Sequence, residues 1–121
     1  MVNPENTSRL IKHLRSKPEV GFNMSVWMSA QITIYPDNSG LNRKEVGCLA
    51  THCFRVANGR YPKPSEHLDL FKTATSFLGL EPSVACDLIF PPIANGFDRK
   101  VTVEQTIQTL EHLMKTGEAK W

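Results

Sequence analysis

Two residue types that bind metals and act as nucleophiles stand close together near the middle of the chain. Cys48 and His52 are four residues apart, so on a helix their side chains would lie on the same side. A thiolate and an imidazole can both bind Zn²⁺, which needs two further ligands in a structural site. A histidine beside a cysteine can also activate the thiol for nucleophilic attack. The spacing therefore raises two hypotheses, a zinc site and a catalytic pair.

Neither hypothesis finds its remaining residues in the sequence. Further zinc ligands would have to come from scattered positions, namely His13, His67, Cys86 and His112. No C-x-x-C pair and no pair of histidines at zinc-finger spacing is present. No carboxylate that orients the histidine and no oxyanion site can be identified. We therefore predict a non-enzymatic protein without a cofactor and keep a zinc-stabilised module as an alternative.

The composition is that of one ordinary folded domain spanning residues 1–121. Hydrophobic residues make up 40% of the chain and charged residues 21%, which argues against disorder. No apolar run approaches the roughly 20 residues that cross a bilayer, and residues 1–5 do not resemble a secretion signal. We therefore expect a cytoplasmic protein without membrane contact, whose three cysteines are free thiols.

Helical periodicity recurs along most of the chain. Asn3 before Pro4 and Thr102 with Gln105 are typical helix starts, whereas Gly59, Gly79 and Gly117 are typical ends. The predicted helices cover Pro4 to Ser16, Val46 to Ala57 with Asn42 as an upstream cap, Glu66 to Leu78, a short segment from Pro82 to before Pro91, and a last one that follows Thr102 and ends at Gly117. The fold class is therefore mainly α, a compact domain of four or five short helices.

The helix predicted over Val46 to Ala57 would separate two cysteines. At 100° per residue its apolar stripe contains Val46, Leu49, Ala50, Cys53, Phe54, Val56 and Ala57. Cys48, Thr51 and His52 fall on the opposite side of the wheel. We therefore expect Cys53 in the core and Cys48 with His52 on the outer side, near the solvent.

A different period follows the first helix. Apolar and polar residues alternate from Phe22 to Tyr35, which is typical of a strand, and residues 36–40 form a strong turn signal. No partner strand is evident. The segment predicts a small β element around Ile32–Tyr35, either as one arm of a small sheet or as an edge strand that pairs with another molecule, including a second copy of the chain.

Two sets of residues are candidate macromolecule-binding sites. Trp27 and Tyr35 lie opposite the apolar face of the strand, where aromatic side chains would anchor a partner, although Trp27 could instead pack beneath the first helix. The proline-containing loop offers Arg60, Tyr61 and Lys63 as a second group of anchors. These residues favour a protein partner.

A cluster of cations in the first helix offers an alternative function. Arg9, Lys12, Arg15 and Lys17 fall within one short segment and could contact phosphates of a nucleic acid. The net charge of +2 is too weak to require such a partner. Alternatively, these four cations simply form a solvent-exposed face of the helix and bind no phosphate.

Several short motifs resemble, in order, those of a family of small phage- and prophage-encoded proteins with no established activity. Phe22 to Trp27 resembles that family's F-x-M-x-x-W segment, and Cys48 to Cys53 is similar to its C-G-T-T-H-C helix motif, with Leu49 and Ala50 in place of Gly-Thr. Phe77 to Phe90 and Val101 to Trp121 resemble its later segments, while Met28 to Gly47 resembles an insertion.

The resemblance implies where the protein comes from and in which cell it acts, and implies little about its chemistry. It carries over no catalytic residue. It implies a small helical accessory protein that acts in a bacterial host cell by binding a host or phage macromolecule. Its specific form would be an inhibitor of a bacterial defence system, similar in role to anti-CRISPR proteins.

Overall fold

The computed structural model describes residues 2–18, 20–22, 28–34, 41–90 and 101–121. These residues form α1 (Pro4–Arg15), β1 (Gly21–Phe22), β2 (Met28–Ile34), β3 (Leu41–Gly47), α2 (Leu49–Asn58), the 3-10 helix η1 (Pro64–Asp69), α3 (Leu70–Leu78), α4 (Pro82–Ile89) and α5 (Val103–Thr116). The predicted class, mainly helical with a small β element, is confirmed.

The helix ends follow the local signals in the sequence. The Asn3 side chain accepts a hydrogen bond from the Asn6 N–H at 3.0 Å at the start of α1. Thr102 and Gln105 form the expected capping box at the start of α5. Gly59, Gly79 and Gly117 all adopt the left-handed conformation that ends a helix, with φ of 74°, 68° and 77°.

Two predicted helix starts are wrong. α2 begins at Leu49 rather than Val46, with Cys48 as its extended N-cap residue, and the predicted cap Asn42 lies within β3. The first part of the helix predicted from Glu66 is the 3-10 helix η1, and α3 begins only at Leu70. Residues 41–47 pair with the preceding strand β2, and helical periodicity does not detect such pairing.

The sheet has three strands in the order β1-β3-β2. β2 and β3 are antiparallel over seven residue pairs, from Met28 opposite Gly47 to Ile34 opposite Leu41. β1 is parallel to β3 and pairs only through Gly21 with Val46 and Phe22 with Gly47. The predicted strand is thus split between β1 and β2, and its partner β3 was not expected from the sequence.

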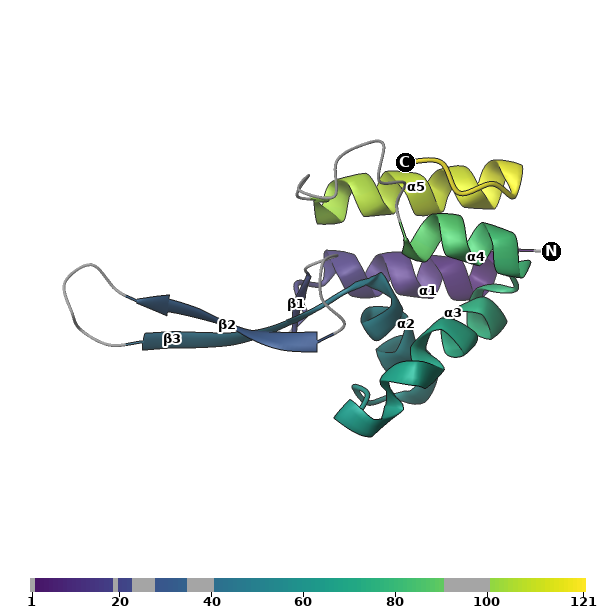
Figure 1. Cartoon of the computed structure of the whole chain (residues 1–121). Helices are drawn as coiled ribbons and strands as arrows, with labels where there is room; N and C mark the ends of the chain where they lie inside the picture. Colours follow the sequence, from purple (N-terminus) through teal and green to yellow (C-terminus); the bar gives the residue numbers. More distant parts are fainter. Residues whose placement is uncertain (1, 19, 23–27, 35–40, 91–100) are drawn as a thin grey trace.

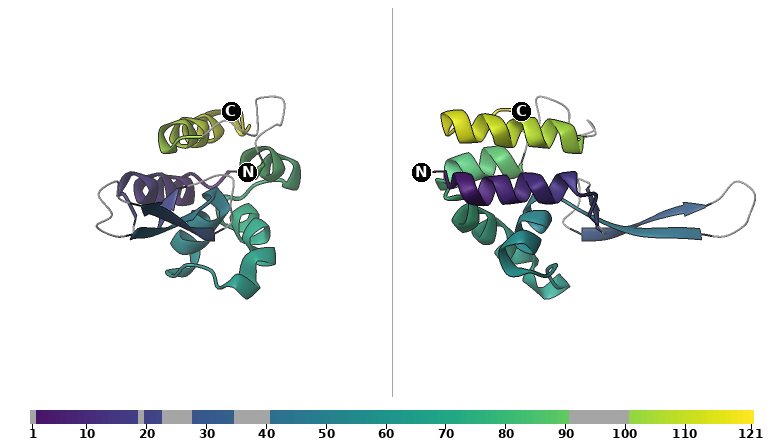
Figure 2. Two further views of the ribbon diagram at one scale, coloured as in Figure 1. Left: turned by 60° about the vertical axis from the view of Figure 1, so that its left-hand side comes forward. Right: turned by 180° about the vertical axis from the view of Figure 1, so that it is seen from behind.

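β2 and β3 form a two-stranded arm, comprising residues 28–34 and 41–47, that extends away from the helices (Figures 1 and 2). The end of the arm nearest the helices is the Met28–Gly47 pair, next to the start of α2. β1 pairs with β3 only at this end. The arm is therefore joined to the helical body at one end only.

The helices pack in layers, with α5 on one side, α1 and α4 in the middle, and α2 and α3 on the other side (Figure 1). Their apolar sides meet in one core, whose fully buried large residues include Leu10, Leu49, Leu78, Leu88, Ile107 and Leu110. Trp121 packs against this core, and its indole N–H donates to the Asp87 carbonyl at 2.9 Å.

The start of α1 contacts the end of α3 through two hydrogen bonds. The Asn3 N–H donates to the Leu78 carbonyl at 2.8 Å, and the Asn6 side-chain amide donates to the Phe77 carbonyl at 2.9 Å. Both carbonyls belong to the last turn of α3, where helical partners are lacking. None of the described helices combines the length and apolar character needed to cross a bilayer.

Candidate functional site

A pair of histidines joins α1, α2 and β1 near the base of the arm. His13 Nε2 lies 3.0 Å from His52 Nδ1, and His52 Nε2 lies 2.8 Å from the Gly21 carbonyl oxygen. His52 is fully buried, whereas His13 is half-buried. The two rings thus link helices that are far apart in the sequence to the strand that pairs with β3.

The partners of His52 determine which ring nitrogens carry protons. A carbonyl oxygen only accepts, so His52 Nε2 must donate to Gly21. Nδ1 of the neutral His52 ring then accepts from Nε2 of His13. A neutral His52 thus has a partner at both ring nitrogens, whereas a protonated His52 would have to donate from Nδ1 and His13 would have to accept at Nε2.

Burial favours the neutral form of His52. It lowers the pKa of His52, the hydrogen bond to Gly21 partly offsets this, and the charge of a protonated His13 lowers the pKa again, which together place it at about 4. The pKa of His13 is also lowered, first by burial and then by the charge on Arg55. Both rings are therefore neutral at neutral pH.

Aromatic contacts complete the surroundings of His52. The Phe22 ring stacks on it with centroids 6.0 Å apart, and the Tyr61 ring meets it edge-on at 5.9 Å. The expectation that His52 lies on an outer surface is wrong. α2 packs against α1, α3 and β3, so both sides of this helix are covered, and Thr51 is fully buried as well.

The expectation for Cys48 is wrong for the same reason. Its side chain is only 4% exposed, and its sulfur lies 3.7 Å from the Thr51 hydroxyl oxygen. Cys53 is fully buried, as predicted, and burial raises the pKa of its thiol to about 12, which leaves a poor nucleophile. Cys86 is exposed.

The zinc and catalytic hypotheses lack further groups in the described part of the chain. There, no three His, Cys, Asp or Glu side chains lie close enough to hold a metal ion. Of the sequence's candidate ligands, His13 does contact His52, but no third ligand joins this pair among the described residues. The histidine pair is an internal connection between elements.

The cations of the first helix face different neighbours. The Arg9 guanidinium lies over the Phe77 ring of α3, 5.6 Å from its centroid, and donates to the Val56 carbonyl of α2 at 3.4 Å. Arg15 instead pairs with Glu111 of α5 at 3.2 Å. Lys12 and Lys17 are exposed. The predicted basic group is thus divided between two sides of the molecule, which does not favour a continuous phosphate-binding strip.

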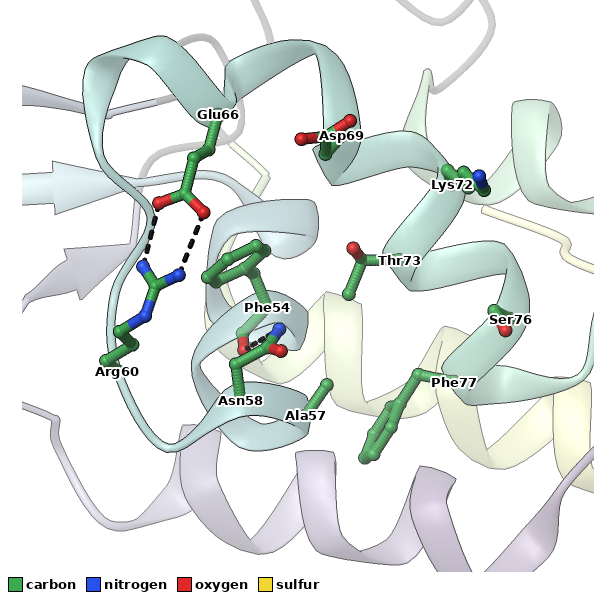
Figure 3. Close-up of a pocket in the computed structure, with 10 residues that line it drawn as sticks. All are labelled: Phe54, Ala57, Asn58, Arg60, Glu66, Asp69, Lys72, Thr73, Ser76 and Phe77. Atoms are coloured by element: carbon green, nitrogen blue, oxygen red, sulfur yellow. Dashed lines mark hydrogen bonds and ion pairs between the residues drawn. The ribbon is translucent and has the colours of Figure 1, made fainter.

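The loop after α2 is held in place by a bidentate ion pair (Figure 3). Arg60 Nη1 and Nη2 lie 2.7 and 2.9 Å from the two carboxylate oxygens of Glu66, and the guanidinium lies over the Phe54 ring at 5.3 Å. The Lys63 N–H also donates to Glu66, at 2.8 Å. The hydrogen bonds from Arg60, followed by that from Lys63, lower the pKa of the Glu66 carboxyl to about 2.

This ion pair stands at one end of an open groove between α2 and α3 (Figure 3). The groove has a volume of about 480 Å³. Phe54 and Ala57 of α2 and Phe77 of α3 supply apolar surface, while the charged residues Arg60, Glu66, Asp69 and Lys72 line the remainder with Asn58, Thr73 and Ser76. An open apolar surface surrounded by polar groups is typical of a protein-binding site.

The candidate binding residues of the sequence have different positions. Arg60 lines the groove. Tyr61 is half-buried between His52 and Arg55, whose guanidinium lies 5.7 Å from the ring centroid, and Lys63 is exposed. Trp27 and Tyr35 lie outside the described residues.

Two apolar residues of this region were not recognised as candidates from the sequence. Helical spacing over Glu66 to Leu78 puts Phe77 in the apolar stripe, which predicts a core position, and leaves Leu68 outside it. Phe77 is instead only half-buried and lines the groove, and Leu68 of η1 is 80% exposed.

No family of known proteins matches the chain, nor does any curated protein or solved structure.

Proposed function

We propose that the chain is a non-enzymatic accessory protein that binds another protein through the groove between α2 and α3. The observation that carries this proposal is an open apolar groove with a charged border, next to a segment in which Leu68 is 80% exposed. An apolar pocket surrounded by polar groups suits the anchor side chain of a protein partner.

The charges of the groove favour a protein over a nucleic acid. Arg60 and Lys72 are cationic, whereas Glu66 and Asp69 are anionic, so the border is balanced. Arg60 is already engaged with Glu66. Nucleic-acid sites need several cations free to replace the counterions of the phosphates. A balanced border instead suits a partner that carries charges of both signs.

The resemblance to phage-encoded proteins suggests the biological setting. The chain would act in the cytoplasm of the bacterial host, where its partner is a host protein or complex. The specific version is inhibition of a bacterial defence complex, in the manner of an anti-CRISPR protein. By binding through the groove, the chain would cover a surface that the defence complex needs for its activity.

Two matched substitutions test the role of the groove. Ala57→Arg places a long charged side chain on an exposed residue of the groove, and Gln108→Arg makes the same addition on an exposed residue of α5. Neither position is part of the core, so both variants should fold, which circular dichroism and thermal unfolding check. The two proteins then differ chiefly in whether the groove is filled.

The assay immobilises the three proteins and captures proteins from a lysate of phage-infected bacteria. We expect a partner that the original chain and the Gln108→Arg variant retain and the Ala57→Arg variant loses at least about 10-fold, or roughly 1.4 kcal/mol. Equal capture by all three would refute the role of the groove. If the chain inhibits a CRISPR defence complex, its expression should restore phage plating on cells with active CRISPR interference. The Ala57→Arg substitution should abolish that effect.

A further inference from the structure

The geometry points to a homodimer in which β2 pairs antiparallel with β2 of a second copy. The two three-stranded sheets would then form one continuous six-stranded sheet. This inference concerns the arm and is independent of the groove between α2 and α3. The proposed function assigns no role to the arm, and dimerisation would give it one.

One edge of β2 has no partner strand in the described part of the chain. The strand order β1-β3-β2 puts β2 at the border of the sheet over all seven of its residues. Its inner side pairs with β3 without interruption, from Met28 opposite Gly47 to Ile34 opposite Leu41. A regular border strand presents N–H and C=O groups in the spacing that another strand requires.

β2 also lacks the features that usually block such an edge. Proteins protect border strands with charged residues, prolines or bulges. The sequence from Met28 to Ile34 contains no charged residue and no proline, and its seven pairs with β3 show no bulge. β1 covers the other side of β3 only at Val46 and Gly47, so the rest of that side is also an edge of the described sheet. That edge carries three consecutive charged residues, Arg43, Lys44 and Glu45. The edge of β2 is therefore the one suited to pairing.

The pattern of β2 favours a second copy over an unrelated strand. Apolar and polar residues alternate as Met-Ser-Ala-Gln-Ile-Thr-Ile, which has the same pattern from either end. Antiparallel pairing centred on Gln31 places Met28 opposite Ile34 of the partner subunit and Ala30 opposite Ile32 of the partner subunit. Apolar residues then share one face of the joined sheet, and a shift by one residue would break this match.

The position of the arm determines where the two helical bodies would lie in this pairing. The helical body adjoins the Met28 end of β2, and the strand leads away from it (Figure 1). In the antiparallel dimer, the Met28 end of one strand lies beside the Ile34 end of the other. The two bodies therefore stand at opposite ends of the paired strands, on the order of 20 Å apart for a strand of seven residues.

The inference is tested by placing charged residues at position 31, where the two-fold axis of the proposed dimer would pass. Gln31 would face Gln31 of the partner subunit, so Gln31→Lys alone or Gln31→Glu alone places like charges opposite each other. Mixing the two variants places opposite charges there. Gln31 also pairs with Lys44 of its own chain, so circular dichroism of each variant must show an intact fold. Gln108→Lys on α5 is the matched control.

The readout is the mass of the full chain in solution, measured by sedimentation and light scattering from about 1 to about 100 µM. We expect twice the chain mass of 13.6 kDa for the original protein and the control. Each Gln31 variant alone should associate about 2- to 5-fold more weakly, and the mixture should recover the dimer.

Three results would overturn the inference. They are a monomer at every concentration, a Gln31→Lys variant that dimerises as well as the original chain, and a mixture that does not recover the dimer. Open-ended growth to larger species would also contradict a closed pair. Ala57→Arg should leave the dimer intact, so loss of partner capture and loss of dimerisation can be told apart.

Discussion

Acidification should destabilise the fold through His52, because this histidine is held neutral by its surroundings. Its pKa is lowered from an ordinary value of 6.5 to about 4 in the folded chain. Between these two pH values the unfolded chain binds more protons than the folded one. The free energy of unfolding therefore falls as the pH drops through this window and levels off below about pH 4.

The size of the effect follows from the two pKa values. At about pH 5 the unfolded His52 is almost fully protonated, whereas the folded one is mostly neutral, which corresponds to a loss of about 2 kcal/mol relative to about pH 7.5. Below both pKa values the limit is about 3 kcal/mol. The pKa of His13 is also lowered, so its protonation acts in the same direction.

Urea unfolding at a series of pH values measures this loss, and His52→Gln provides the comparison. The glutamine amide can still donate to the Gly21 carbonyl but does not titrate. The variant should therefore lose about 2 kcal/mol less than the original chain between about pH 7.5 and about pH 5. Titrating groups that do not contact residue 52 are common to both proteins and cancel, and His13→Gln in both backgrounds removes the remaining titrating neighbour. Parallel pH curves for the two proteins would refute the reasoning.

Three further results are expected. Leu110→Ala removes a fully buried side chain and should lower the free energy of unfolding by about 2–5 kcal/mol in urea titrations, and a loss below about 1 kcal/mol would contradict its place in the core. In the native chain, Cys86 should react with a water-soluble thiol reagent much faster than Cys53, and the difference should vanish in urea; equal native rates would show that Cys53 is accessible. Arg60→Met should raise the pKa of Glu66 from about 2 towards its ordinary value of 4.5 in an NMR titration, and an unchanged value would assign the shift to another group.

Features set by neighbouring residues were predictable from the sequence. The cap at Asn3, the capping box at Thr102 and the left-handed glycines depend on contacts within a few residues, and all are present. The burial of Cys53 was also predictable, because its position lies in the middle of an apolar stripe. Each of these inferences needs only the geometry of one helix.

Features set by packing between distant segments were not predictable in this way. A helical wheel assumes that one side faces solvent, but α2 is covered on both sides, so Cys48 and His52 are buried. The strand character of residues 41–47 depends on pairing with β2, and the charges of Arg43, Lys44 and Glu45 give no alternating pattern. The groove was missed because it needs α2 and α3 side by side.

The hydrogen bonds between the first residues and the last turn of α3 have a consequence for local opening. Asn3 and Asn6 donate to the Leu78 and Phe77 carbonyls. The start of α1 thus supplies hydrogen-bond donors, and the end of α3 supplies the acceptors. If Asn6→Ala removes one donor, amide protons in the last turn of α3 should exchange with deuterated solvent faster, although they are more than 70 residues away along the chain. The two helix ends would therefore fray as a single unit.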